Sequence, residues 1–281
     1  MLCRAYGAET IGDSWQDVGR SSIVEAYRQG WLNETALSAP RSPMCRSVLV
    51  ESAFAAADVP VYDSTLYEGG ASLSTADNIL RVGRELGLCS DDADTNALVT
   101  RGDAAIILHV VLTQSFRIEE PPVPVTLVNA AGVNVNDFLL ELRKLPEQVL
   151  DAFNAAGWTY CIDFDYMGGL SKKLNMSCIG ATSYGQKTIY ISEASATLHE
   201  FGHFLDWMLG FPAEHEQLFR AEAAAAPLRD YAKTNAREYF ADCFAYWVKY
   251  AENANAISLL QECAPMTFRY MEEVTILQWP D

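Results

Sequence analysis

The segment from Leu198 to Asp206, LHEFGHFLD, combines residue types that can bind a metal and use it for hydrolysis. On a helix, His199 and His203 lie one turn apart and project to the same side, so both imidazoles can bind one zinc ion. Glu200 follows the first histidine and can reach the open coordination position, where it would deprotonate a metal-bound water. The alternative is a helix with two surface histidines. The metal site is favoured because half of the chain's histidines fall within this motif.

Two imidazoles leave a catalytic zinc site one protein ligand short. The metzincin pattern HExxHxxGxxH is excluded, because Asp206 and Leu209 occupy the positions of its glycine and third histidine. The remaining route is a glutamate on a later helix. Glu238, in the segment REYFADCFAYW, supplies one in the manner of the gluzincins, which combine HExxH with a downstream glutamate.

Glu238 and Asp242 are four residues apart and share one face of the predicted helix. We therefore expect Glu238 to bind zinc while Asp242 accepts the free ring N–H of a zinc histidine, with His199 as the expected donor. The alternative for Glu238 is a capping-box residue paired with Asn235, because N-x-x-E also fits a helix start. Other nearby glutamates lack a carboxylate one turn further on, which favours the ligand.

The elements that must position these residues form an α+β pattern. Aromatic and β-branched residues predict strands over 158–164 and 187–192. The polar, glycine-bearing stretch between them is expected to be irregular, with Gly180 and Gly185 marking either a mobile loop or turns. Helices are predicted over 134–145, 146–157, 193–210, 235–251 and 267–276.

A proline-rich seam, EEPPVPV at 119–125, separates this region from an upstream helical one. Upstream, two amphipathic helices, 21–31 and 76–88, each end at a glycine and are each followed by a second helix. Those second helices begin near Arg46 and Arg101, and the register between the two copies is kept within two residues. The sequence therefore predicts an internal repeat of helix pairs.

Composition narrows the possible partners. The 281 residues include 20 Lys and Arg against 37 Asp and Glu, and the net charge of −17 disfavours nucleic acid. The longest apolar stretch, 104–112, is about half of the ~20 residues that cross a bilayer, so no membrane span is expected. The first ten residues contain no apolar core of a signal peptide. Seven cysteines without CxxC spacing argue against a cysteine zinc finger, and a Cys161–Cys178 bridge would require adjacent strands.

HEFGHFLD with the downstream REYFADCFAYW resembles the catalytic domain family of anthrax lethal factor, which includes secreted proline-proline endopeptidases. The resemblance covers 127–281 and implies a zincin-type metallopeptidase with one zinc per chain, bound by His199, His203 and Glu238. It implies Glu200 as the general base. It also implies a catalytic tyrosine seven residues before the ligand glutamate, which is Tyr231. Its phenol could stabilise the oxyanion, whereas Tyr231 by itself fits an ordinary half-buried tyrosine.

The upstream repeats resemble S-layer homology repeats, which dock bacterial surface proteins onto cell-wall polysaccharide. VTRGDAA at 99–105 is similar to that family's signature, whereas MCRSVLV at 44–50 keeps only its arginine. The resemblance covers 20–115. Together, the two resemblances and the proline-rich seam predict two repeats over 1–118, a linker at 119–126 and a peptidase domain over 127–281. The resemblance to surface repeats implies an extracellular or bacterial cell-surface location.

The sequence thus predicts a zinc metalloendopeptidase acting on secreted or surface proteins or peptides. Its substrate is expected to lie as an extended strand along the sheet edge near 179–187. One alternative is a catalytically inactive wall-binding or structural surface protein, against which the retention of Glu200 speaks. Another is a toxin-type protease that acts inside a different cell. The helical repeats point instead to the producer's own surface.

Overall fold

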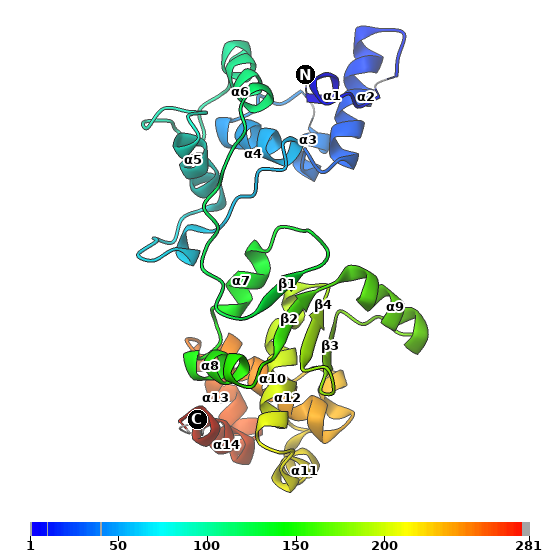
Figure 1. Cartoon of the computed structure of the whole chain (residues 1–281), viewed down its shortest axis with the longest axis vertical. Coiled ribbons are helices and arrows are strands. Elements are labelled where there is room, and N and C mark those ends of the chain that lie inside the picture. The colour runs from blue at the N-terminus through cyan, green and yellow to red at the C-terminus, as the bar shows by residue number, and fades with distance from the viewer. Residues whose placement is uncertain (1, 10, 40, 277–281) are drawn as a thin grey trace. The chain divides into compact units, whose positions relative to one another are not determined.

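The computed structural model of the chain describes residues 2–9, 11–39 and 41–276. The last five residues of the predicted peptidase domain, 277–281, lie outside the described residues. Contacts divide the chain into two units, residues 1–122 (unit 1) and residues 123–281 (unit 2). Unit 1 is helical and unit 2 combines a small sheet with helices, so the predicted α+β class is confirmed (Figure 1).

Unit 1 is built from helices, and side chains cap the starts of three of them. Its elements are α1 (Leu2–Ala5), α2 (Trp15–Arg28), α3 (Glu34–Ser38), α4 (Arg46–Ala56), η1 (Ser64–Leu66), α5 (Thr75–Glu85) and α6 (Arg101–Thr113). Ser14 caps α2, Ser74 caps α5 and Thr100 caps α6, each accepting a hydrogen bond from the backbone of an aspartate three residues on. The predicted glycines after α2 and α5, Gly30 and Gly87, both have the positive φ of a helix end.

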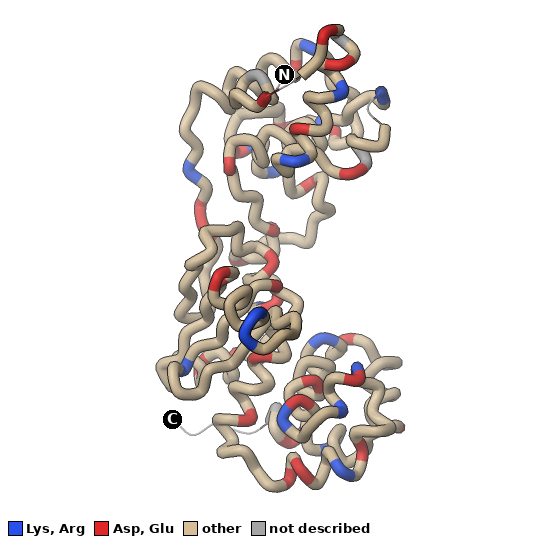
Figure 2. The backbone as a smooth tube through the Cα atoms, turned by 90° about the vertical axis from the view of Figure 1, so that its right-hand side faces the viewer, with Lys and Arg blue, Asp and Glu red and all other residues tan. Residues whose placement is uncertain are grey.

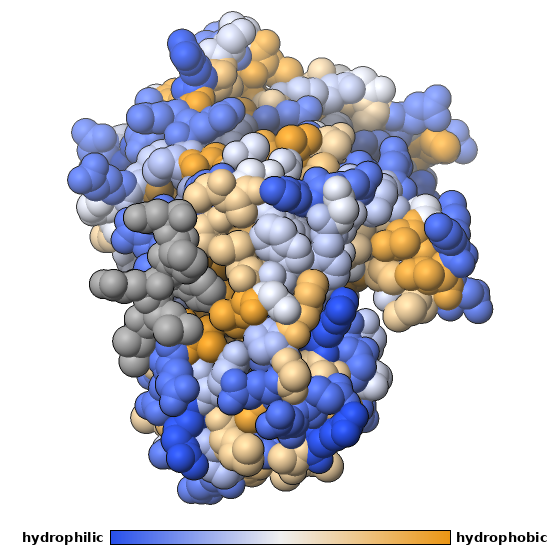
Figure 3. Space-filling view, turned by 60° about the horizontal axis from the view of Figure 1, so that its bottom comes forward, coloured by the Kyte–Doolittle hydropathy of each residue, from blue (hydrophilic) through white to orange (hydrophobic). Residues whose placement is uncertain are grey.

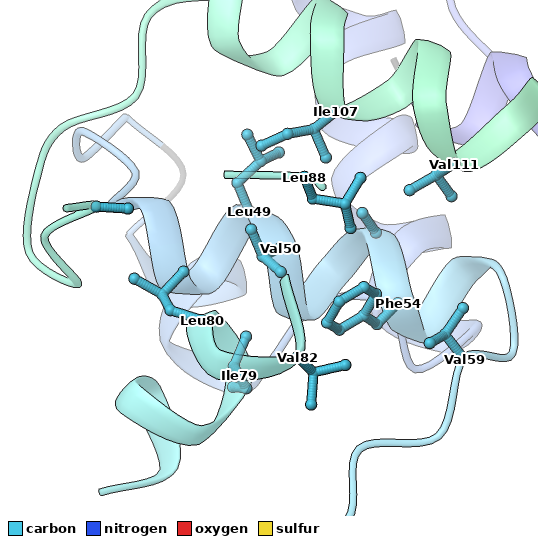
Figure 4. Packing of buried hydrophobic residues seen from close by; sticks show 12 residues of the cluster. Leu49, Val50, Phe54, Val59, Ile79, Leu80, Val82, Leu88, Ile107 and Val111 are labelled. Atoms are coloured by element: carbon cyan, nitrogen blue, oxygen red, sulfur yellow. The ribbon is translucent and has the colours of Figure 1, made fainter. Parts of the chain in front are cut away.

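The core of unit 1 is mostly aliphatic and lies where α4, α5 and α6 meet (Figure 4). Val50 and Phe54 of α4 are almost fully buried, as is Leu80 of α5. Ile107 of α6 joins the same cluster. A single antiparallel bridge joins Cys45 to Leu98, which precede α4 and α6. The predicted second helices of the two copies therefore pack against one core.

Unit 2 is built around a four-stranded mixed sheet of order β1-β2-β4-β3. Its strands are β1 (Leu127–Asn129), β2 (Thr159–Ile162), β3 (Gly180–Ser183) and β4 (Thr188–Ile191). The pairs β1–β2 and β2–β4 are parallel, whereas β3 runs antiparallel to β4 and forms one edge of the sheet. Helices α7 (Asn136–Leu142) and α8 (Glu147–Ala155) connect β1 to β2.

The remaining elements of unit 2 include the three that carry the predicted site residues. They are α9 (Phe164–Leu174), η2 (Ala194–Ala196), α10 (Thr197–Met208), α11 (Ala213–Glu222), η3 (Asp230–Lys233), α12 (Ala236–Lys249), α13 (Ala254–Cys263) and α14 (Pro265–Ile276). The predicted site residues lie on α10, η3 and α12. Helix α10 packs against α8 and the sheet through buried aromatic rings. The Phe201 ring centroid lies 4.8 Å from that of Phe153 in α8 and 6.2 Å from that of Tyr160 in β2. This aromatic layer fixes the face that α10 turns to the sheet.

The stretch that was expected to be irregular between β2 and β4 is instead folded into α9 and β3. Asp163 caps α9 and Met167 anchors it in the core, while Asn175 adopts the left-handed conformation at its end. The helices α11 and α13 were also not predicted. Cys161 lies in β2, which does not neighbour β3, and the seven cysteines are free, so the condition for a Cys161–Cys178 bridge is not met.

The surface is acidic and mixed in character. Acidic residues are distributed along both units, with basic residues interspersed among them (Figure 2). On the face shown in Figure 3, hydrophobic residues occur in separate groups among hydrophilic ones. Among the described helices, none has the length and apolar character needed to cross a membrane.

Candidate metal centre and active site

The centre of the site is the first half of α10. Its start is fixed to the sheet by a buried hydrogen bond of 2.6 Å between the hydroxyls of Tyr160 in β2 and Thr197. Two turns of this helix carry His199, Glu200 and His203, which are all at most 8% exposed. Burying three ionisable side chains on one helix is costly unless they have partners. Here the two histidines face each other, and Glu200 contacts Thr182 of β3.

Helix α12 approaches α10 closely enough to add a third ligand. A Cβ atom at Gly202 would lie only 2.6 Å from the Cα of Ala241, so a side chain at Gly202 would force the two helices apart. This contact brings the first turn of α12, with Glu238, against the two histidines. Gly202, the fourth residue of HEFGH, is therefore what allows the third ligand to reach the site.

The ligand atoms of His199, His203 and Glu238 converge on one point. The two Nε2 atoms are 3.1 Å apart, and Glu238 Oε2 lies 3.1 Å from His199 Nε2 and 3.3 Å from His203 Nε2. In a tetrahedral zinc site with metal–ligand bonds of roughly 2.0–2.1 Å, two ligand atoms lie about 3.3 Å apart. The three atoms thus have the spacing of one face of such a site.

The chemistry of these atoms also fits a cation. Glu238 Oε2 is buried and, despite its two close nitrogens, accepts no well-directed hydrogen bond within the described residues. Burial opposes ionisation of Glu238, but the two histidines outweigh it and hold the pKa of this carboxyl below its usual range. A charged carboxylate oxygen and two imidazole nitrogens aimed at one point form the His₂Glu donor set of catalytic zinc sites.

Asp242 sets the orientation of His199. Its Oδ1 lies 2.6 Å from His199 Nδ1, so the Nδ1–H donates to the carboxylate and Nε2 faces the ligand cluster. Although burial alone would lower it, the pKa of His199 is raised to about 9 by Asp242 and Glu238. Within the described residues, His203 Nδ1 is buried without a hydrogen-bond partner.

Asn235 and Glu238 have separate tasks. The Asn235 side chain accepts hydrogen bonds from the amides of Arg237 and Glu238 and so caps α12. The Glu238 carboxylate is turned toward the histidines. The sequence pattern N-x-x-E therefore marks the helix start without engaging the glutamate side chain as its cap.

Glu200 lies beside the ligand cluster and under the edge strand β3. The Thr182 hydroxyl donates a 2.7 Å hydrogen bond to Glu200 Oε2. A Cβ atom at Gly180 would lie 2.6 Å from Glu200 Oε1, so only glycine leaves room for the carboxylate. Burial raises the pKa of Glu200, while His199, His203 and Thr182 oppose the shift. A raised carboxyl pKa suits a group that must take up and release a proton.

Tyr231 stands at the opening of the site, in η3. Its side chain is 43% exposed, and its ring centroid lies 6.2 Å from that of His199. Burial and the nearby charges of Glu238 and Glu200 raise the pKa of the phenol, so it stays protonated and able to donate a hydrogen bond at neutral pH.

Two cavities, of about 760 Å³ and about 650 Å³, meet at this centre. Both are lined by Gly180, His199, Glu200 and Tyr231. From there the larger cavity continues past Arg229, and the smaller one follows β3. The ligand cluster is therefore open to solvent in two directions, one along each cavity.

Sequence reasoning missed three residues of the site, which are Gly180, Thr182 and Arg229. Gly180 and Thr182 fall within the expected substrate edge near 179–187, but neither was assigned a contact with Glu200. Arg229 forms a two-point contact with Asp242 at 2.6 and 2.8 Å. None of them carries a local spacing signal, because each is brought to the site by the fold.

The packed helices and the His-His-Glu cluster define a domain of the metallopeptidase class. Residues 141–274 match the family described as anthrax toxin lethal factor, N- and C-terminal domain. That range includes every predicted ligand and catalytic residue. Among solved structures, the Pro-Pro endopeptidase from Paenibacillus alvei matches with 16% identity and a TM-score of 0.41, covering 54% of this chain and 96% of that chain. No curated protein sequence matches the chain.

Proposed function

We propose that unit 2 is a zinc-dependent endopeptidase that hydrolyses peptide bonds of secreted or surface proteins. The observation that carries the proposal is the convergence of His199, His203 and Glu238 within 3.1 to 3.3 Å, with the buried Glu200 beside them. A zinc ion held by these three side chains would polarise a peptide carbonyl and make water nucleophilic near neutral pH.

The chain's own residues supply the proton transfers and the charge stabilisation. Glu200 takes a proton from the attacking water and delivers it to the leaving amine, which the raised pKa of its buried carboxyl favours. Tyr231 donates a hydrogen bond to the oxygen that gains negative charge as the carbonyl is attacked. Thr182 holds the Glu200 carboxylate in place for this exchange.

The substrate is an extended peptide that lies along β3. Within the described chain β3 pairs only with β4, so its other edge is available for backbone hydrogen bonds from an added strand. The cavity that follows β3 is lined by Gly180, Ala181 and Thr182 of this strand, and both cavities meet at Glu200. A peptide on this edge would therefore pass the group proposed as the base.

Replacing Glu200 by Gln tests the proposal. We expect hydrolysis of a peptide library to fall by about 10²- to 10⁴-fold, because proton transfer is lost. Zinc content should be unchanged, because Glu200 is not one of the three converging ligands. The matched control is Glu147→Gln, at an exposed glutamate of α8, which should keep full activity. Hydrolysis by Glu200→Gln at the parent rate would contradict the proposed mechanism.

We also propose that unit 1 binds cell-wall polysaccharide through residues 20–115 and holds the enzyme outside the cell, on the bacterial surface. The Cys45–Leu98 bridge supports this, because it brings together the starts of α4 and α6, where Arg46 and Arg101 stand. The test is sedimentation of the full chain with purified bacterial cell walls. The Arg46→Gln/Arg101→Gln variant should remain in solution, and equal sedimentation of both proteins would contradict this role.

A further inference from the structure

Arg229 is a residue of the site that neither the zinc motif nor the ligand glutamate requires. It directly precedes η3, and its guanidinium group binds both oxygens of Asp242 on α12, with Nε 2.6 Å from Oδ2 and Nη2 2.8 Å from Oδ1. A two-point contact of this kind fixes the plane of the carboxylate as well as its position. Lysine, which offers a single point charge, cannot reproduce it.

The carboxylate that Arg229 fixes is the one that orients His199. Asp242 Oδ1 accepts hydrogen bonds from both Arg229 Nη2 and His199 Nδ1, while Arg229 Nε donates to Oδ2. The Asp242 side chain is only 8% exposed. Removing Arg229 would leave the Asp242 carboxylate with its hydrogen bond from His199. That one bond would not prevent rotation of the carboxylate about the χ2 angle of Asp242.

The same guanidinium group also lies against Tyr231. Its central carbon is 5.2 Å from the centroid of the phenol ring, which is the range of a cation–π contact. Tyr231 belongs to a 3₁₀ helix of four residues and is 43% exposed, so local structure constrains it weakly. Arg229 therefore contacts both the carboxylate behind His199 and the tyrosine at the mouth of the site.

We propose that Arg229 is a positioning residue. It fixes the Asp242 carboxylate that orients His199, and it holds the Tyr231 ring beside the ligand cluster. The inference rests on the proposed function, because it assigns Arg229 a task in the same site. A purely structural ion pair is the competing explanation. The Arg229 side chain is 55% exposed and the Asp242 side chain 8%, so a structural role alone would appear as a loss of stability without a change in zinc affinity.

Zinc affinity separates the two explanations without any measurement of activity. Competition with a chromophoric chelator should show that Arg229→Gln weakens zinc binding by up to about 10-fold, the low end of the loss that follows removal of a ligand's direct partner, because Arg229 acts through Asp242. Arg229→Lys should fall between the parent and Arg229→Gln. The Asp242→Asn variant should lose at least as much affinity, and adding Arg229→Gln to it should cost little more, because both act through His199.

Unit 1 offers a matched control. Arg81 is also partly exposed, forms a 2.7 Å ion pair with Glu85 and lies 5.7 Å from the ring centroid of Tyr67. Arg81→Gln should leave zinc affinity and peptide hydrolysis at the parent level. It removes the same kinds of contact from a region without metal-ligand residues.

The contact with Tyr231 is tested by the rate of hydrolysis at saturating zinc. Arg229→Gln should lower kcat more than it raises KM. In a Tyr231→Phe background its effect on kcat should shrink, because the group that it braces is gone. Additive effects on kcat would overturn this part of the proposal.

The outcomes also distinguish this inference from the proposed function. Parent-level zinc affinity in a folded Arg229→Gln protein would overturn the role of Arg229, while hydrolysis by the parent would still uphold the peptidase. Weakened zinc binding in Arg229→Gln, with a zinc-loaded parent that cleaves no peptide, would uphold the positioning of His199 and contradict the peptidase.

Discussion

The two units differ most in what they bury. The buried polar side chains described in unit 1 are neutral: Ser47, Ser52, Ser64 and Asn78. Those in unit 2 are mostly ionisable: His199, Glu200, His203, Asp206, His215, Glu222 and Asp242, beside the neutral Thr197 and Thr267. Ionisable groups are costly to bury unless each has a partner. The contrast indicates that unit 1 is stabilised by apolar packing, whereas unit 2 keeps charges that serve a site.

The buried charges of unit 2 extend beyond the metal ligands. His215 of α11 lies between Asp206 of α10 and Tyr270 of α14, with its ring nitrogens 2.7 Å from Asp206 Oδ1 and 2.9 Å from the Tyr270 hydroxyl. Burial raises the pKa of Tyr270 to about 12. Glu222 accepts two 2.8 Å bonds from the amides of Met266 and Thr267 at the start of α14. These contacts join α11 and α14 to each other and, through Asp206, to α10, the helix that carries His199 and His203.

The largest effect is expected from His215→Ala. It leaves Asp206, which is 1% exposed, as an unpaired buried charge and should cost about 3–5 kcal/mol of the free energy of unfolding of unit 2. Hydrogen exchange resolved by segment gives this cost for each unit separately. The control in unit 1 is Ser52→Ala, which removes one 2.8 Å hydrogen bond to Val48 and should cost about 1 kcal/mol. Equal losses from the two variants would remove the contrast between the units.

A core substitution in unit 1 should destabilise unit 1 and leave the metal site of unit 2 unchanged. Leu80 is fully buried among the aliphatic residues of α4, α5 and α6, and Leu80→Ala should destabilise unit 1 by about 2–5 kcal/mol. Zinc content and peptide hydrolysis should stay at the parent level. Loss of zinc by this variant would show that the metal site depends on the core of unit 1 and would contradict the contrast between the two units.

The sequence predicted the site better than the elements around it. His199, His203, Glu238 and Asp242 could be found because ligands on one helix face repeat at fixed spacing. Helix α9 was missed because two adjacent glycines each lower helix propensity by about 1 kcal/mol, and the burial of Met167 that anchors the helix is a tertiary effect.

The partners that tune the site could not be predicted in the same way. Thr182 reaches Glu200 only because β3 pairs with β4 and forms the sheet edge above α10. Arg229 and Asp242 are 13 residues apart and on different elements, and no local pattern links them. Such contacts follow from the packing of the fold.

Zinc binding is expected to change the free energy of unfolding less than His215→Ala or Leu80→Ala. Zinc at about 100 times its Kd should stabilise unit 2 by about 2.7 kcal/mol, because it binds the folded site and not the unfolded chain. Removal by a chelator should reverse this. Hydrogen exchange should show the change in α10 and α12 and none in α4 to α6. Equal stabilisation of both units by zinc would contradict a metal site confined to unit 2.

The proposed function depends on a three-ligand zinc site formed by His199, His203 and Glu238. Elemental analysis of the purified chain beside its Glu238→Ala variant tests it most directly, with Glu147→Ala as a surface control. We expect one zinc per chain in the parent and in the control, and a clear loss in Glu238→Ala, because only two of the three protein ligands remain. Zinc absent from the reconstituted parent, or equal zinc in the parent and Glu238→Ala, would contradict it.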